Sequence, residues 1–218
     1  MRGLDIGIAG CGVAGLAAAL LLARDGHRVR LYERFDAPRP VGSGLIVQPT
    51  GLAVLDRLGL AGRLAATAAP IERLLGKAGE RTVLDVRYEW LRRPGARGLG
   101  VHRAALFEVL HEAVLAQGLA IETGRTVAAA REGRLHFADG GRSDRHDLLV
   151  DALGSASPLA GQPSRLLAYG ALWASLDAVE GFDEAALEQR YRRASTMAGV
   201  LPLGGGRAAF FWSLRGDA

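Results

Sequence analysis

A glycine-rich hexapeptide near the N-terminus has the residue types and spacing that bind a dinucleotide. Gly10, Gly12 and Gly15 fit the pattern G-x-G-x-x-G between an apolar run and a helix-forming run. The first glycine permits a tight turn, the second lets the backbone approach a pyrophosphate, and the third lets helix and strand pack closely. The N–H groups at the helix start attract phosphate oxygens. The predicted cofactor contacts in this loop are Gly10, Cys11, Gly12, Val13, Ala14 and Gly15.

An acidic residue ends the second predicted strand. Glu33 follows the loop at close to the distance of about 20 residues where a carboxylate accepts a hydrogen bond from a ribose hydroxyl. Arg34 is predicted beside it in the cofactor site. A carboxylate repels a 2′-phosphate, so NADP is disfavoured here. FAD and NAD both stay open on this motif alone, because each contains adenosine diphosphate with a free ribose.

Other chemistry is scarce in the sequence. There is no Gly-x-Ser-x-Gly elbow, and the 5 histidines lack metal-ligand spacing, so no metal is expected and the catalytic residues are unknown. Cys11 is the single cysteine, which excludes a disulfide framework. A helix N-terminus would stabilise its thiolate, but we expect Cys11 to pack against the bound dinucleotide.

Composition excludes two classes of partner. The net charge is +4 with a pI near 9.8, but the arginines are scattered among acids, so no nucleic-acid surface is expected. The apolar segment 4–23 is interrupted by glycines and has no cleavage pattern, so neither a membrane span nor a signal peptide is predicted. We expect a soluble, cytoplasmic protein.

The elements that position the loop form a βαβ unit: a strand over 4–9, a helix over 13–24 that Gly26 ends, and a strand over 29–32. Further helices are expected over 51–58, 61–67, 103–117 and 184–193. Strands are expected within 71–90 and over 119–122, 126–130, 135–137, 148–153, 166–176, 197–203 and 208–214, with loops over 37–44 and 92–100. The strand over 148–153 is expected to be buried, and Gly204–Gly206 predicts a hairpin.

Four later segments follow the fingerprint in a distinctive order. They are GSGLIVQPTG (42–51), VHRAAL (101–106), DLLVDALG (147–154) and FFWSL (210–214). In this order they resemble the FAD-dependent aromatic-ring hydroxylases, the single-component flavin monooxygenases similar to para-hydroxybenzoate hydroxylase. The resemblance covers essentially the whole chain, but only the N-terminal part of a family member.

The resemblance implies further cofactor contacts. Gly44 would lie near the flavin, Arg103 would reach the FAD phosphates, Val127 would present its backbone to the adenine, and Gly154 would complete the site. It implies an α/β fold in which a Rossmann-like FAD-binding domain (1–70 and 95–160) is interleaved with a β-rich, incomplete substrate domain (71–94 and 161–218).

The sequence departs from the family pattern at two places. The family's Asp-Gly pair and later arginine are replaced by Leu153 and Ala160, with Asp151 two residues from the motif position. Gly216-Asp217 follows the Phe-Trp strand directly, whereas the family's Gly-Asp motif comes after a long segment, so we expect a truncated chain or a missing internal segment. The final strand is expected to form an exposed edge that favours a homo-oligomer.

The function that the resemblance implies is hydroxylation of an aromatic or polyketide-like small molecule, with FAD, NAD(P)H and O₂. We expect this chain to bind FAD without hydroxylating on its own. Two alternatives stay open: a non-catalytic FAD-binding remnant or partner subunit, and an NAD-dependent dehydrogenase.

Overall fold

The computed structural model describes residues 3–37, 42–161, 167–177, 180–193 and 195–215. The chain divides into two compact units, each built from two segments. Unit 1 is Met1–Pro40 with Phe107–Arg165, and unit 2 is Val41–Leu106 with Leu166–Ala218. The mixed α/β architecture, with one parallel sheet and separate β-rich sheets, confirms the predicted fold class.

The compact units do not coincide with the domains predicted from the sequence. Residues 41–70 and 95–106 were assigned there to the FAD-binding domain, but they belong to unit 2. Compactness does not report which ligand a segment binds. The division into a FAD-binding and a substrate domain therefore stays a prediction.

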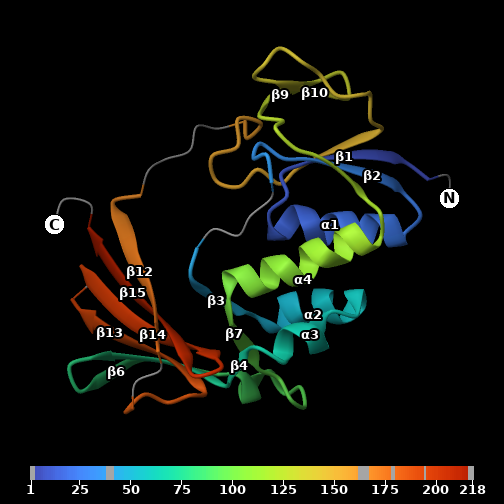
Figure 1. Cartoon of the computed structure of the whole chain (residues 1–218). Coiled ribbons are helices and arrows are strands. Elements are labelled where there is room, and N and C mark those ends of the chain that lie inside the picture. The colour runs from blue at the N-terminus through green and yellow to red at the C-terminus, as the bar shows by residue number, and fades with distance from the viewer. Residues whose placement is uncertain (1–2, 38–41, 162–166, 178–179, 194, 216–218) are drawn as a thin grey trace. The chain divides into compact units, whose positions relative to one another are not determined.

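Unit 1 is built on a parallel four-stranded sheet. Its strand order is β11(Leu148–Asp151), β1(Asp5–Ala9), β2(Arg28–Tyr32) and β8(Ala120–Glu122). Within unit 1, helix α1 lies along one side of this sheet, and the antiparallel hairpin of β9(Val127–Arg131) and β10(Arg134–Phe137) lies on the other (Figure 1). Parallel strands covered on both faces are typical of nucleotide-binding α/β folds.

Helix α1 covers Val13–Arg24, as the sequence predicts. Its sequence is rich in alanine and leucine, which favour helix, and its buried side includes Leu16 and Leu20. The helix ends where Gly26 adopts a positive φ of 86° and donates its N–H to the Ala23 carbonyl. Local sequence therefore determines both ends of this element.

Unit 2 contains a six-stranded sheet and a smaller three-stranded one. The larger sheet has the order β12(Tyr169–Asp177), β15(Arg207–Arg215), β14(Thr196–Gly204), β13(Ala186–Arg192), β5(Arg73–Ala78) and β6(Arg81–Arg87), and only its β13–β5 pair is parallel. The smaller sheet has the order β3(Gly44–Val47), β7(Gly98–His102) and β4(Ala69–Ile71). The helical elements are α2(Pro49–Leu58), α3(Ala61–Ala65), the 3₁₀ turn η1(Tyr88–Leu91) and α4(Arg103–Ala116). The boundary between the two units falls within α4.

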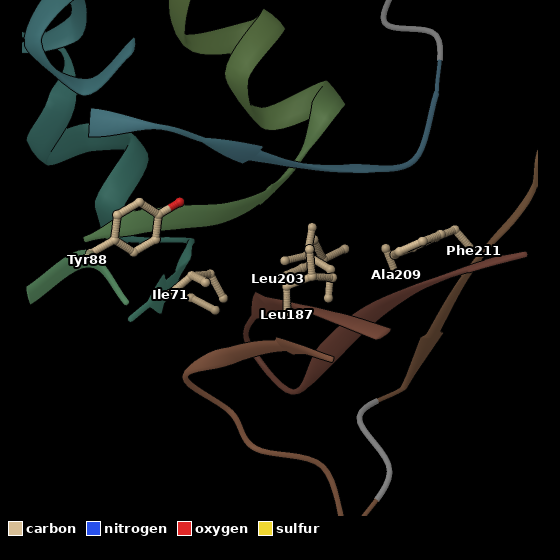
Figure 2. Close-up of a cluster of buried hydrophobic side chains, with 8 residues drawn as sticks. Ile71, Tyr88, Leu187, Leu203, Ala209 and Phe211 are labelled. Atoms are coloured by element: carbon tan, nitrogen blue, oxygen red, sulfur yellow. The ribbon is translucent and has the colours of Figure 1, made fainter. Parts of the chain in front are cut away.

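The core of unit 2 lies between its two sheets. Side chains from one face of the large sheet, including Leu187, Leu203 and Phe211, pack with Ile71 and Tyr88 (Figure 2). Tyr88 donates its hydroxyl to Oε1 of Gln48 at 2.6 Å, so its one polar group is satisfied. This packing orders strands that are distant in the sequence.

The helix predicted over 184–193 is wrong, because this segment contains strand β13. Its alanine, leucine, glutamate and arginine favour helix. The strand nevertheless pairs with β14 on one side and β5 on the other, and Leu187 is buried in the core. Strand pairing on both sides outweighs a local preference for helix of roughly a few tenths of a kcal/mol per residue.

Four smaller expectations also need correction. The strand predicted over 148–153 ends at Asp151 and is not buried, since it is an edge strand and Leu148 is 44% exposed. The loop predicted over 92–100 gives way to β7 at Gly98, and strand β3 starts at Gly44, in the predicted loop 37–44. The final strand is not an edge, because β15 lies between β12 and β14. The first residue of the strand predicted over 166–176 lies outside the described residues, as do Gly216 and Asp217.

Candidate functional site

The fingerprint turn in unit 1 adopts a conformation that requires glycine at its first position. Gly10 has φ of 103° and donates its N–H to the carbonyl of Tyr32 at 2.8 Å. A Cβ at Gly10 would lie 2.5 Å from the carbonyl oxygen of Ala152. The turn is therefore fixed between the ends of β1, β2 and β11.

Helix α1 starts directly on this turn. A Cβ at Gly15 would overlap the carbonyl oxygen of Gly10, so only glycine allows the helix to approach so closely. Gly12 is the N-cap and supplies no side-chain hydrogen bond, which leaves the first N–H groups of the helix without a capping side chain. The positive end of the helix dipole is thus available to an anion.

Gly12 differs from its two neighbours in the motif. A Cβ built there would find no atom within 4 Å, and its φ of −72° is accessible to any L-residue. Neither packing nor backbone strain within the described residues therefore demands glycine at this position. Open space beside uncapped helix N–H groups is the feature expected of a pyrophosphate cradle.

Glu33 is brought to the same turn. Its side chain is buried, with the residue 9% exposed. Its Oε2 accepts the N–H of Cys11 at 2.9 Å, and its Oε1 accepts the N–H of Phe35 at 3.1 Å. Each carboxylate oxygen has a second lone pair, so Glu33 can also accept a hydrogen bond from a ribose hydroxyl.

Cys11 is 2% exposed and points away from solvent. Burial, together with the charge of Glu33, raises the pKa of its thiol to about 12. The thiol is therefore protonated at neutral pH, and the dipole of α1 does not make it a nucleophile.

The structure also places the other residues of unit 1 that the sequence predicts as cofactor contacts. Val13 is partly exposed and Ala14 is exposed in the first turn of α1, and Gly154 follows β11 with φ of 83°. Arg34 is exposed, with its guanidinium 4.6 Å from the ring centroid of Phe35. Val127 opens β9 and packs into the core beneath Tyr32, so only its backbone could meet a ligand.

The two predicted residues of unit 2 line one pocket. Gly44 and Arg103 face a cavity of about 640 Å³ together with the exposed Trp173 and the pair Ser43 and Ser175, whose hydroxyls lie 3.3 Å apart. Arg103 opens α4 and has no carboxylate partner among the described residues. A Cβ at Gly44 would lie 2.6 Å from Cβ of Ala209, so packing alone accounts for this glycine.

The residues that depart from the family pattern have local roles in unit 1. Leu153 stands at the position of the family's acid and packs against the cluster of Ala9, Tyr32 and Val127. Asp151 accepts the N–H of Leu153 at 3.0 Å and the hydroxyl of Ser157 at 2.6 Å, and so closes the turn after β11.

Sequence reasoning missed a polar array in unit 1 that includes two buried side chains, His146 and Tyr32. Asp5 Oδ1 hydrogen-bonds Nδ1 of His146, whose Nε2 lies 2.9 Å from the hydroxyl of Tyr32. A Cβ at Gly7 would lie 2.5 Å from the His146 ring, so Gly7 makes room for the imidazole. The sequence shows only a lone histidine, because its partners lie far from it in the chain. In the described part of the chain, no His, Cys, Asp or Glu side chains cluster as a metal site would require.

Comparison with known proteins gives these features a family context. The FAD binding domain model matches residues 3–144. The chain is 41% identical over 165 residues to 3-amino-4-hydroxybenzoate 2-monooxygenase of Streptomyces cremeus, covering 70% of this chain and 40% of that protein. It is 30% identical over 220 residues to aurachin C monooxygenase/isomerase of Stigmatella aurantiaca, covering 96% of this chain and 56% of that protein.

The fold agrees with these matches. The tetrameric form of 2-methyl-3-hydroxypyridine-5-carboxylic acid oxygenase superposes with a TM-score of 0.85 at 21% identity, covering 100% of this chain and 60% of that one. The chain thus spans about 40 to 60% of the length of these relatives. No helix in the described ranges combines the length and apolarity needed to cross a bilayer. With its fingerprint, its fold and these matches, the chain belongs to the FAD-binding family of flavoprotein aromatic monooxygenases.

Proposed function

We propose that unit 1 binds the adenosine diphosphate half of FAD, and that the chain is the FAD-binding portion of a monooxygenase that hydroxylates a small aromatic molecule. The observation that carries the proposal is the open space at Gly12, the uncapped N-cap of α1, next in sequence to Cys11, whose N–H donates to the carboxylate of Glu33. Gly10 and Gly15 are explained by the packing of the protein itself, but Gly12 is not. A bound pyrophosphate would explain why position 12 is a glycine.

Each residue of unit 1 has a defined part in this proposal. The N–H groups of Val13 and Ala14 would bind the phosphates, while Glu33 would accept hydrogen bonds from the adenosine ribose. The backbone of Val127, with Arg34 and Gly154, would surround the adenosine. Cys11 would remain a neutral, packed side chain, since its pKa is raised to about 12.

For unit 2 the proposal concerns the pocket that contains Gly44 and Arg103. Arg103 is a cation without a carboxylate partner among the described residues, so it suits an anionic group of the cofactor. Trp173 offers an aromatic surface to a planar ring.

Bound FAD would supply the redox chemistry, because the cofactor carries the reaction and the protein supplies its binding site. The chain's residues would hold the cofactor, orient it and limit access of water. The electron donor is proposed to be NAD(P)H, and the substrate an aromatic compound. Support for the substrate class comes from the relatives' names, which include 6-hydroxynicotinate 3-monooxygenase from Bordetella bronchiseptica.

Equilibrium dialysis of the purified chain against FAD, NAD and NADP tests the binding proposal. FAD should bind, and NADP should bind most weakly, because Glu33 repels a 2′-phosphate. Tighter binding of NADP than of FAD would contradict the assignment of Glu33. Preference for NAD over FAD would favour the dehydrogenase alternative.

A second candidate function is FAD binding without efficient turnover, and Leu153 is the observation that favours it. The family's acid at this position is replaced by a partly buried side chain that packs against a core cluster of unit 1. Reduction of bound FAD by NADH, followed by stopped-flow absorbance, should then be slow in the native chain and faster in Leu153→Asp. Fast reduction that the substitution leaves unchanged would rule this candidate out.

A further inference from the structure

Three polar side chains form a hydrogen-bonded array inside unit 1. The Nδ1 atom of His146 bonds Oδ1 of Asp5, the first residue of β1, and its Nε2 lies 2.9 Å from the hydroxyl of Tyr32, the last residue of β2. His146 is 4% exposed and Tyr32 is 0% exposed. Polar groups buried to this degree cost free energy unless each has its partner, so the presence of the array requires a physical reason.

The hydrogen-bonding capacities of the three groups match. Asp5 accepts from His146 and, through Oδ2, from the Nε–H of Arg28 at 2.7 Å. A neutral imidazole has one donor and one acceptor, so its Nδ1–H donates to Asp5 and its Nε2 accepts from the hydroxyl of Tyr32. Gly7 makes room for the ring, since a Cβ there would lie 2.5 Å from the His146 side chain. A fully satisfied buried network of this kind holds its members in one arrangement.

The main chain at Tyr32 holds the fingerprint turn. The carbonyl of Tyr32 accepts the N–H of Gly10 at 2.8 Å. The next residue, Glu33, accepts the N–H of Cys11 at 2.9 Å through its carboxylate. The end of β2 thus sets the position of the turn and of the carboxylate that is proposed to bind the ribose. Since the hydroxyl of Tyr32 is bonded to His146, the array restrains this strand end.

The same array reaches the β9–β10 hairpin. The backbone N–H of His146 donates to the carbonyl of Gly133, in the turn of the hairpin, at 2.8 Å. The side chain of Tyr32 belongs to one buried cluster with Val127, at the start of β9, and its ring centroid lies 5.6 Å from that of Phe137, at the end of β10. The backbone of Val127 is proposed to lie beside the adenosine. The array therefore connects the strand end and the hairpin from which the proposed adenosine contacts come.

We propose that Asp5, His146 and Tyr32 are positioning residues for the adenosine diphosphate half of FAD. They hold the end of β2 and the β9–β10 hairpin in the arrangement in which Glu33 and the backbone of Val127 reach the same ligand. His146 and Tyr32 are buried, so they act through these residues and not by contact with the cofactor. This role rests on the proposed function of unit 1. It adds a requirement to it, because loss of the array should weaken binding although the fingerprint and its acidic partner remain.

Calorimetric titration of the whole chain with FAD and, separately, with ADP tests this role with two matched tyrosine variants. Tyr32→Phe removes a hydroxyl from the array, and Tyr88→Phe removes a buried hydroxyl of unit 2 that bonds Gln48 at 2.6 Å. Tyr32→Phe leaves Nε2 of His146 without its partner and should weaken binding of both ligands by about fivefold to tenfold, because both contain adenosine diphosphate. Tyr88→Phe should bind both like the native chain.

The outcomes separate this role from the proposed function of unit 1. A native chain that binds neither FAD nor ADP would overturn the proposed function and the positioning role with it. A native chain that binds both, with native affinity of Tyr32→Phe for either ligand or an equal loss in Tyr88→Phe, would overturn the positioning role alone.

Two substitutions of His146 separate positioning from packing. His146→Leu fills the space with an apolar side chain, whereas His146→Gln supplies an amide that donates and accepts in place of the two ring nitrogens. In folded chains, His146→Leu should weaken FAD binding by about tenfold or more, and His146→Gln should stay within about threefold of the native affinity. Equal affinities of the two variants would show that position 146 acts by packing alone and would overturn the role. Tyr32→Phe deletes one oxygen and keeps the ring, so the test does not depend on the folding of His146→Leu.

Discussion

The three glycines of the fingerprint have three different physical reasons. Gly10 needs its positive φ, Gly15 needs the absence of a Cβ against the Gly10 carbonyl, and Gly12 has space around it. The first two requirements belong to the fold and would exist without any ligand. Only the third points to a bound molecule.

This difference predicts stability effects of different size for two similar substitutions. Gly15→Ala forces the helix away from the turn and should lower the free energy of unfolding by about 1–3 kcal/mol or more. Gly12→Ala should change it by less than about 1 kcal/mol, because its Cβ meets no atom within 4 Å. Urea unfolding followed by circular dichroism measures both. Equal losses would show that Gly12 is also required by packing.

Cys11 gives a second prediction at this scale. Since its pKa is raised to about 12 and the side chain is buried, the folded chain should resist alkylation by iodoacetamide at pH 8. The same chain in guanidinium chloride should react within minutes, and it serves as the control because Cys11 is the only cysteine. Rapid labelling of the folded chain would mean that the turn opens readily or that the thiolate is stabilised after all.

Among the elements, β1 and β2 are joined to the segment before β11 by the array of Asp5, His146 and Tyr32. Asp5 Oδ2 also accepts Nε–H of Arg28 at 2.7 Å, so both carboxylate oxygens are bonded. Partial burial alone would raise the pKa of Asp5, but the hydrogen bonds from His146 and Arg28 lower it below the usual 3.8. An ionised Asp5 can only accept, so Nδ1 of His146 is the donor in this bond.

The lowered pKa of Asp5 predicts the direction of acid sensitivity. A carboxyl that binds its proton more weakly in the folded state stabilises the fold above its unfolded pKa, near 3.8, and this contribution disappears as the pH falls through the folded value. Asp5→Asn should therefore destabilise the chain by about 1–3 kcal/mol at pH 7. The difference from the native chain should shrink below about pH 4. Chemical unfolding at pH 7, 5 and 3 measures it, and a constant difference would contradict the role of ionised Asp5.

Elements determined by local sequence were predictable, while elements determined by distant partners were not. The helix over 13–24 and the hairpin at Gly204–Gly206 have their signals within a few residues, and both are present. Strand β13 consists of helix-favouring residues and is a strand because β5, more than 100 residues earlier by number, pairs with it. The edge or interior position of β15 likewise depends on where β12 lies.

For the whole molecule, the sequence was sufficient to predict a glycine turn between a strand and a helix, with Glu33 ending the next strand. The structure brings the two together, since the N–H of Cys11 donates to Glu33 at 2.9 Å. Their role in cofactor binding stays a prediction. The buried array around His146 could not be predicted, because Asp5 lies 141 positions away and only the parallel β1–β11 pairing brings the two segments together. The six-stranded sheet of unit 2 is equally a product of long-range pairing.

The central claim is that the space above Gly12 holds the pyrophosphate of FAD. Titration of the chain with FAD, followed by quenching of flavin fluorescence, tests it with Gly12→Val and the matched control Gly62→Val, since a Cβ at Gly62 also meets no atom within 4 Å. The account predicts that Gly12→Val weakens FAD binding by at least about tenfold while the chain stays folded, and that Gly62→Val binds FAD like the native chain. A folded Gly12→Val chain that binds FAD with native affinity would contradict it.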